Sequence, residues 1–398
     1  MAFALTFLAS VGAVYKVAWF DGQVQGGVVW PSDAISLAIL VLALVLLIRD
    51  FVLTRSSAAI PFWAATVLCL LLLAALLLFN ARYLARWEGT ADSAAALNVG
   101  IQEILAGRDP YVAETFLGNR VSPMLGGFIL AAPFFWAFGS SGVQTIAWLV
   151  VAVIFLWRVA GPRGAAAFAV LVLASPVIRL NLVTELDHLA IAVVLVVSGT
   201  LGYFACRARP GWGSSLTLLA SAAVFGVAVA DRFIYAVVLV PLAAVTWRDA
   251  ARPRAIRWIA VTLGFTAVTM LLPLLRNSES YLQGPVALGL NKVAGGQSGI
   301  TTVALVALGL VVLVIVAWRV RTLADAWLGS ALVLAAVMIA NVVSIGFRDG
   351  WFDALTRYVA VDYNGAWLVL GLAGLVMPRE FSFGQGVWPT PVQAIVKA

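Results

Sequence analysis

The sequence predicts an all-α, polytopic membrane protein of about 12 to 13 transmembrane helices. Of its 398 residues, 63% are hydrophobic and 11% are charged, whereas roughly a quarter of the residues in a soluble domain are charged. Apolar runs of about 20 residues, enough to cross a bilayer, recur from the N-terminus to about position 377. These runs are continuous, which favours helices over the alternating strands of a barrel. We expect one transmembrane domain, residues 1–380, and a tail, residues 381–398.

Thirteen apolar segments are candidate spans, and their ends are uncertain by several residues. They are 3–20, 35–48, 60–80, 123–138, 143–157, 164–178, 189–205, 214–230, 233–247, 257–275, 300–318, 325–346 and 361–377. The segment 123–138 is short and contains Gly126, Gly127 and Pro133. Whether it crosses the membrane completely or is tilted or re-entrant stays open.

Clusters of arginine predict the topology, because basic loops stay on the cytoplasmic side. Such clusters lie at 49–55, 207–209, 248–257 and 319–321. The connections 81–122, 179–188, 276–299 and 347–360 then face outward. The net charge of +7 is explained by these loops, so no nucleic-acid partner is expected. The first segment has no basic region before it and is expected to be a retained span rather than a signal peptide.

The predicted outer loop, residues 81–122, is long and of mixed polarity, as functional loops often are. Apolar residues recur at helical spacing at Leu97, Ile101, Ile104 and Leu105, which predicts an amphipathic helix over residues 93–106. Such a helix is expected to lie on the membrane surface. Gly107 should end it, and a turn should follow at Asp109-Pro110-Tyr111.

Asp92 stands directly before this helix and has two interpretations. An aspartate there can cap the helix by accepting bonds from its first backbone N–H groups. A carboxylate at the mouth of a membrane cavity can instead act as a general base on an acceptor hydroxyl.

The motifs of this loop resemble those of a known protein family. It contains Gly89-Thr90-Ala91-Asp92, then the surface helix ending Leu105-Ala106-Gly107-Arg108-Asp109-Pro110-Tyr111, then Ser122-Pro123 with Gly126-Gly127. This order resembles the first outer loop of the GT-C glycosyltransferases, most closely their bacterial polyprenol-phosphate-mannose-dependent mannosyltransferases. The likeness covers about residues 60–250. It departs from the family in having two spans before residue 60, since the catalytic loop usually follows the first span.

The resemblance implies a GT-C-like fold and an inverting transfer of mannose or a related sugar. The donor would be a polyprenyl-phosphate sugar and the acceptor a lipid or glycan. The protein would lie in the bacterial inner (plasma) membrane with its active site facing outward. By the same resemblance, Asp92 is the catalytic base.

A second outer segment groups Glu185, Asp187 and His188, the last being the single histidine of the chain. A histidine at a helix start often only caps or packs. Three titratable groups within four residues also form a plausible acceptor-binding or proton-handling cluster. We assign these residues, with Tyr111, to acceptor or sugar binding, although Tyr111 also fits an aromatic membrane belt.

The pair Asp231-Arg232 interrupts a long apolar stretch, so it must occupy a sharp hairpin or dip into the membrane. It can be an ion pair that closes the hairpin, or it can face a substrate. The resembling enzymes carry a basic residue here, which makes Arg232 the first choice for the donor phosphate, with Arg357 and Lys292 as partners. Anchoring to lipid headgroups explains these cations equally simply.

No phosphate loop, dinucleotide fingerprint or H-E-x-x-H metal motif occurs in the sequence. We therefore expect no cofactor and no required metal, although Asp92 with another carboxylate could hold a divalent cation. The competing function is a multi-span transporter or lipid flippase, and a non-catalytic scaffold is a third. Transporters tend to show paired repeats and broken helices, and no repeat is visible here.

Overall fold

The computed structural model describes residues 93–116, 118–175, 178, 181–182, 186–287, 299–349 and 364–378. Within these ranges the chain is helical and no strand forms, only an isolated bridge between Glu114 and Arg120. The first three predicted spans, together with Asp92, Glu185, Lys292 and Arg357, lie outside the described residues. The predicted number of spans therefore stays a prediction, whereas the all-helical class is observed.

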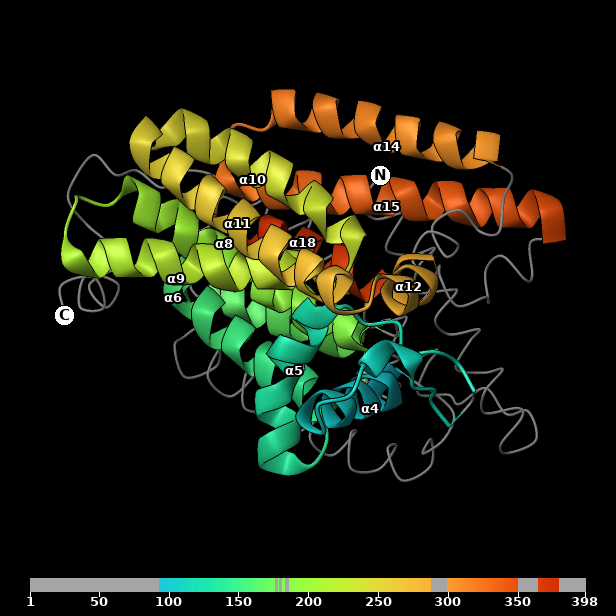
Figure 1. The fold of residues 1–398 in the computed structure, drawn as a ribbon. Helices are drawn as coiled ribbons and strands as arrows, with labels where there is room; N and C mark the ends of the chain where they lie inside the picture. Colours follow the sequence, from blue (N-terminus) through green and yellow to red (C-terminus); the bar gives the residue numbers. More distant parts are fainter. Residues whose placement is uncertain are drawn as a thin grey trace.

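Long helices run side by side through the centre of the molecule (Figure 1). Their bounds are α6 Val143–Ala174, α8 Asp187–Arg207, α9 Trp212–Val229, α10 Ala236–Asp249, α11 Arg252–Arg276, α14 Gly299–Arg319, α15 Leu323–Asp349 and α18 Asn364–Val376. Five described segments are long and apolar enough to cross a membrane: Val143–Gly161, Asp187–Arg207, Trp212–Val229, Arg252–Arg276 and Leu323–Ala340. They agree with predicted spans to within a few residues, except that α11 begins five residues earlier than expected.

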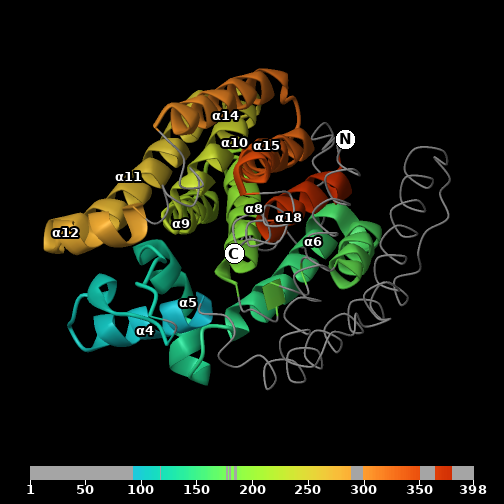
Figure 2. The same cartoon turned by 90° about the vertical axis from the view of Figure 1, so that its right-hand side faces the viewer.

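Two shorter helices, α4 (Ser93–Leu105) and α5 (Leu125–Phe138), lie together at one side of the bundle (Figure 2). The 14 residues of α5 span about 21 Å at 1.5 Å per residue, less than the roughly 30 Å of a bilayer core. α5 is thus a short apolar helix. This length favours the tilted or re-entrant interpretation of residues 123–138 over a full crossing.

The two predicted spans 143–157 and 164–178 correspond to the two helical halves of α6, which a kink separates. The kink lies at Gly161, whose φ of 74° and ψ of 178° are not helical. Gly161 precedes Pro162, and a residue before proline avoids helical geometry. Glycine tolerates this positive φ without strain.

The helix α8 is the centre of the bundle, and almost all of its residues are buried. A glycine lets a neighbour approach closely, since a Cβ on Gly202 would lie 2.1 Å from the indole nitrogen of Trp258 on α11. The indole N–H of Trp327 on α15 donates to the Thr200 hydroxyl at 3.1 Å. The polar residues of this apolar helix are thereby matched to partners.

The helices α11 and α14 form the edge of the bundle and expose large apolar side chains. Val268, Leu272 and Leu275 on α11 are 64%, 57% and 83% exposed, and Val314 on α14 is 67% exposed. Apolar surface of this extent is typical of a partner or a membrane, since soluble monomers seldom present it. Lipid-facing helices account for it, and the composition predicts such helices.

Several helix ends follow from local sequence. Thr322 and Asp325 form a capping box before α15: the Asp325 backbone N–H donates to the Thr322 hydroxyl at 3.1 Å, and the Thr322 N–H donates to the Asp325 carboxylate at 3.0 Å. Gly107, with a φ of 74°, ends α4 as predicted, and the Arg108 N–H donates to the Glu103 carbonyl.

Candidate functional site

The charged connections gather at two opposite ends of the bundle. One end holds the basic turns, because the Arg254 side chain donates to the Ala205 carbonyl at 2.7 Å and Arg248 donates to the Val320 carbonyl. α8 runs from Asp187 at the far end to Arg207 at this basic end, and α9 runs back to the far end, where Asp231 follows it. Residues 205–209, 248–254 and 317–321 thus lie together, as the predicted topology requires, while Asp187 and Asp231 meet at the far end.

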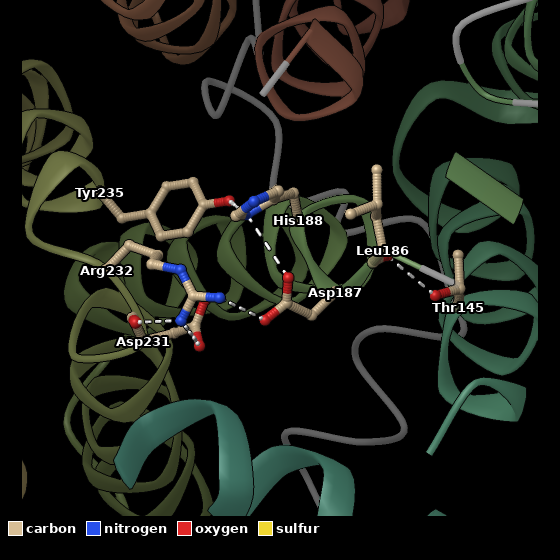
Figure 3. A network of polar contacts seen from close by, with 7 residues as sticks. All are labelled: Thr145, Leu186, Asp187, His188, Asp231, Arg232 and Tyr235. Carbon is tan, nitrogen blue, oxygen red and sulfur yellow. Dashed lines mark hydrogen bonds and ion pairs between the residues drawn. The ribbon is translucent and has the colours of Figure 1, made fainter. Parts of the chain in front are cut away.

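Four charged or titratable side chains and one tyrosine form the polar cluster at that far end: Asp187, His188, Asp231, Arg232 and Tyr235 (Figure 3). Two come from the start of α8 and three from the turn between α9 and α10. Asp187, His188 and Asp231 are 2%, 5% and 0% exposed. Charge buried to this degree is costly unless it is paired, and in membrane proteins it usually serves function.

Arg232 lies between the two carboxylates. Its Nη2 donates to Asp187 Oδ2 at 3.1 Å, and its Nη1 donates to Asp231 Oδ1 at 3.2 Å and to the Asp231 carbonyl at 3.0 Å. The guanidinium plane is therefore fixed from two helices. The predicted hairpin ion pair with Asp231 is observed, and Arg232 also reaches Asp187, 45 residues earlier in the chain.

His188 is held by a hydrogen bond of 2.9 Å between its Nδ1 and the Tyr235 hydroxyl. The same nitrogen lies 3.6 Å from Asp187 Oδ1. Tyr235 is itself fully buried. The imidazole is thus oriented by a tyrosine and lies beside a carboxylate. A histidine that only fills space in the core would need neither contact.

The short 3-10 helix η3 (Phe233–Tyr235) explains how one turn supplies three of these residues. α9 ends at Val229, and extended backbone at Arg232 directs the chain into η3 and then into α10. Asp231 follows the last turn of α9. Burial raises the pKa of the Asp231 carboxyl well above its usual range; Arg232 opposes the increase and Asp187 adds to it.

The predicted outer loop packs against this end of the bundle. A Cβ on Gly127 of α5 would lie 2.2 Å from Asp231 Oδ1, and one on Gly126 would lie 2.2 Å from the Val227 carbonyl. The Met124 N–H donates to the Asp231 carbonyl at 3.4 Å. The two glycines that the sequence singled out therefore let α5 touch the backbone around Asp231.

The same loop is also tied to α11 and to the short helix α12 (Ser278–Tyr281). Arg276 donates to the Gly107 carbonyl at 2.5 Å. Asp109 accepts from the Asn277 amide at 2.7 Å and from the Ser280 hydroxyl at 2.5 Å, and its Oδ1 accepts from the Tyr111 N–H at 3.0 Å. The predicted turn at Asp109-Pro110-Tyr111 is confirmed, and these contacts hold it in place.

Helix α4 confirms the predicted helix over residues 93–106, with a different environment for its apolar face. Leu97 and Ile101 are buried in a cluster with Tyr111, Phe128 and Tyr281, while Leu105 is 71% exposed. The face expected to meet lipid packs largely against α5 instead. Phe128 and Ala131 of α5 are the residues that pack against this face.

Tyr111 lies inside this second apolar cluster and outside the polar cluster. Its ring centroid is 5.2 Å from that of Tyr281 and 6.1 Å from that of Phe128. Burial is the main reason why the pKa of its hydroxyl is raised, followed by Tyr281 and the charge of Asp109. The ring of Tyr111 is packed against protein, with 2% of the residue exposed.

The structure thus brings together Asp187, His188 and Arg232 of the predicted site, and places Tyr111 one layer away behind α5. It adds Asp231 as a site member and Tyr235, which the sequence did not single out. A tyrosine three positions after the Asp-Arg pair was the available signal, because a 3-10 turn returns that side chain to the same side. Asp92, Glu185, Lys292 and Arg357 are outside the described residues.

Comparisons with models of known protein families, with curated proteins and with solved structures found no match. The resemblance to the GT-C glycosyltransferases therefore stays a prediction from the sequence motifs.

Proposed function

We propose that this protein is a membrane glycosyltransferase that moves a sugar from a polyprenyl-phosphate carrier to a lipid or glycan acceptor at the outer face of the bacterial plasma membrane. The observation that carries the proposal is the position of Arg232. It is a guanidinium held by two buried carboxylates, at the end of an apolar bundle where the 93–124 loop segment packs.

The proposed chemistry needs a fixed cation for the leaving phosphate. A guanidinium carries five N–H donors in one plane. If it is already oriented before the reaction, the free energy of reorienting it does not add to the barrier. Asp187 and Asp231 supply this orientation for Arg232. Arg357 or Lys292 would add a second positive charge.

The acceptor hydroxyl needs a base. Asp92 immediately precedes α4, whose partner α5 contacts Asp231. In the proposed mechanism Asp92 removes the proton as the hydroxyl oxygen attacks the anomeric carbon, and the bond from that carbon to the phosphate oxygen breaks. A single displacement inverts the anomeric centre. His188 and Asp187 lie on the acceptor side of the site.

The test supplies radiolabelled polyprenyl-phosphate mannose or arabinose to membranes containing the protein, with product analysed for label. Asp92→Asn should lose transfer by about 10²- to 10⁴-fold, the usual contribution of a general base, and stay folded. Asp249→Asn, at the opposite end of the bundle, is the matched control and should keep near-normal transfer. Near-normal turnover of Asp92→Asn would remove Asp92 from the mechanism.

The second candidate is a proton-coupled transporter or lipid flippase, which the deep burial of Asp187, Asp231 and His188 favours, because buried carboxylate and histidine chains relay protons in such proteins. Proteoliposomes distinguish the two. Movement of a fluorescent polyprenyl-phosphate lipid between leaflets, with no labelled product from either sugar donor, would overturn the glycosyltransferase proposal.

A further inference from the structure

Two carboxylates and an imidazole converge within the polar cluster. One potential ligand atom from each of Asp187, His188 and Asp231 lies within 4.8 Å of the other two. The three residues come from two segments more than 40 positions apart, so only the fold brings them together. An imidazole and two carboxylates are donor types that metal ions bind in proteins.

Arg232 binds one oxygen of each carboxylate and leaves the other oxygen of each for a different partner. Arg232 binds Asp187 Oδ2 and Asp231 Oδ1. Of the remaining oxygens, Asp187 Oδ1 faces His188 Nδ1 at 3.6 Å. Asp231 Oδ2 is buried and has no hydrogen-bond partner among the residues that the structure describes. An unsatisfied buried carboxylate oxygen is costly, and a cation would satisfy it.

We propose that Asp187, His188 and Asp231 bind one divalent transition-metal cation of the Mn²⁺ or Zn²⁺ class. Imidazole suits Zn²⁺ and related ions, whereas carboxylates alone suit Mg²⁺, Ca²⁺ or Mn²⁺, so the mixed set selects a cation that accepts both donor types. The sequence predicted no required metal, because fixed arginines could neutralise the leaving phosphate by themselves.

The three donors are close enough to converge on one ion after local movement. Nitrogen and oxygen ligands lie about 2.0–2.2 Å from Zn²⁺, so two of them in a tetrahedral site are about 3.4 Å apart. The donor atoms here lie within 4.8 Å of one another, so a bound ion would draw them together by up to about 1.4 Å. Tyr235 holds the imidazole through a hydrogen bond of 2.9 Å to Nδ1, so an ion on Nε2 would keep this bond and an ion on Nδ1 would replace it.

The cation would lie beside the guanidinium of Arg232. Its catalytic role, adding positive charge at the departing donor phosphate, rests on the proposed function. Its binding does not, because it depends on the three side chains alone. The proposed metal site and the proposed glycosyltransferase function can therefore be refuted separately.

The experiment uses the full chain, purified in detergent, stripped with a chelator and titrated with Mn²⁺. Electron paramagnetic resonance measures free Mn²⁺, and Zn²⁺ is added as a competitor. One Mn²⁺ per chain should bind and should be displaced by Zn²⁺ but not by an excess of Mg²⁺. Asp231→Asn and His188→Gln, both close in size to the native residues, should each weaken binding by more than about 10-fold. Asp249→Asn should bind as the wild type does.

Thermal unfolding supplies the folding control. Mn²⁺ should raise the Tm of the wild type and of Asp249→Asn, but not that of a folded Asp231→Asn or His188→Gln, because only a ligand of the native state stabilises by mass action. If either Asp231→Asn or His188→Gln does not fold, the Mn²⁺ binding of the variant that does fold tests the proposal. Equal Mn²⁺ binding by wild type and site variants, or no binding by the wild type, would overturn the proposal. Sugar transfer by a protein that binds no cation would overturn this inference and leave the proposed function intact.

Discussion

The two ends of the helical bundle each hold an aspartate–arginine–tyrosine group, and they differ in burial and in charge balance. At the basic end, Tyr203 donates to Asp249 at 2.6 Å and accepts from Arg207 at 2.5 Å. The side chains of Arg207 and Asp249 are 20% and 29% exposed, with one charge of each sign. In the polar cluster, Asp231 and Asp187 are 0% and 2% exposed, and one arginine faces both.

This difference separates a structural contact from a candidate functional one. The pair Arg207–Asp249 has one charge of each sign and is partly hydrated. It connects α8 to the end of α10 and is expected to change the free energy of unfolding only slightly. A group of two buried carboxylates, a guanidinium and a buried, oriented histidine is expensive to fold. Such an arrangement needs another reason for its presence, and binding of a phosphate and a cation supplies one.

The largest expected difference in stability between the two ends comes from removing the arginine at each of them. Arg232→Gln should destabilise the protein by about 3–5 kcal/mol, because it removes the cation that both buried carboxylates contact. Arg207→Gln should cost less than about 1 kcal/mol, as partly exposed pairs do. Denaturant unfolding in detergent, followed by tryptophan fluorescence, measures both. Equal losses would mean that burial does not distinguish the two groups.

A smaller effect tests the contact between α5 and the polar cluster. Gly127→Ala would place a methyl group 2.2 Å from Asp231 Oδ1, so α5 or Asp231 must move, at a cost of about 1–3 kcal/mol. Gly264→Ala on α11 is the matched control, since no atom lies within 4 Å of its Cβ position, and it should lose no stability. Thermal unfolding compares the Tm of Gly127→Ala with that of Gly264→Ala. An unchanged Tm for Gly127→Ala would argue against close packing of the loop on Asp231.

The smallest stability effect is expected for Tyr235→Phe, which removes one hydrogen bond to His188 and should cost about 1 kcal/mol. Its effect on function should be larger, because the imidazole loses its orientation. Tyr203→Phe, at the basic end, should leave sugar transfer unchanged. Transfer assays on both variants, compared with their Tm values, test this. Normal transfer by Tyr235→Phe would remove the tyrosine from the site.

Much of the helical architecture could be predicted, because lipid requires long apolar helices whose backbone is satisfied internally. α8, α9 and α15 begin and end within a few residues of their predicted bounds. Gly107 and the Asp109 turn were also predictable, since they rest on local backbone chemistry. The break between the predicted spans 143–157 and 164–178 is present as non-helical backbone at Gly161, which precedes a proline.

The candidate site was predictable only in part. Asp187, His188 and Arg232 stood out as charges in an apolar chain, and the fold brings these three together. Tyr235 did not stand out, because a tyrosine near a membrane interface is common. The burial of the apolar face of α4 against α5 was also not predictable, since periodicity identifies an apolar face without identifying what covers it.

By itself, the sequence determined that this is a helical, apolar chain with basic turns at one end and a few acidic residues and one histidine elsewhere, because hydropathy and helix termination are local properties. Only the tertiary structure decided that Asp187 and Asp231 share one guanidinium and that Asp231 retains a buried oxygen with no hydrogen-bond partner among the described residues. The physical reason is that charge pairing depends on distances across helices, and those distances are set by packing around α8 rather than by spacing along the chain.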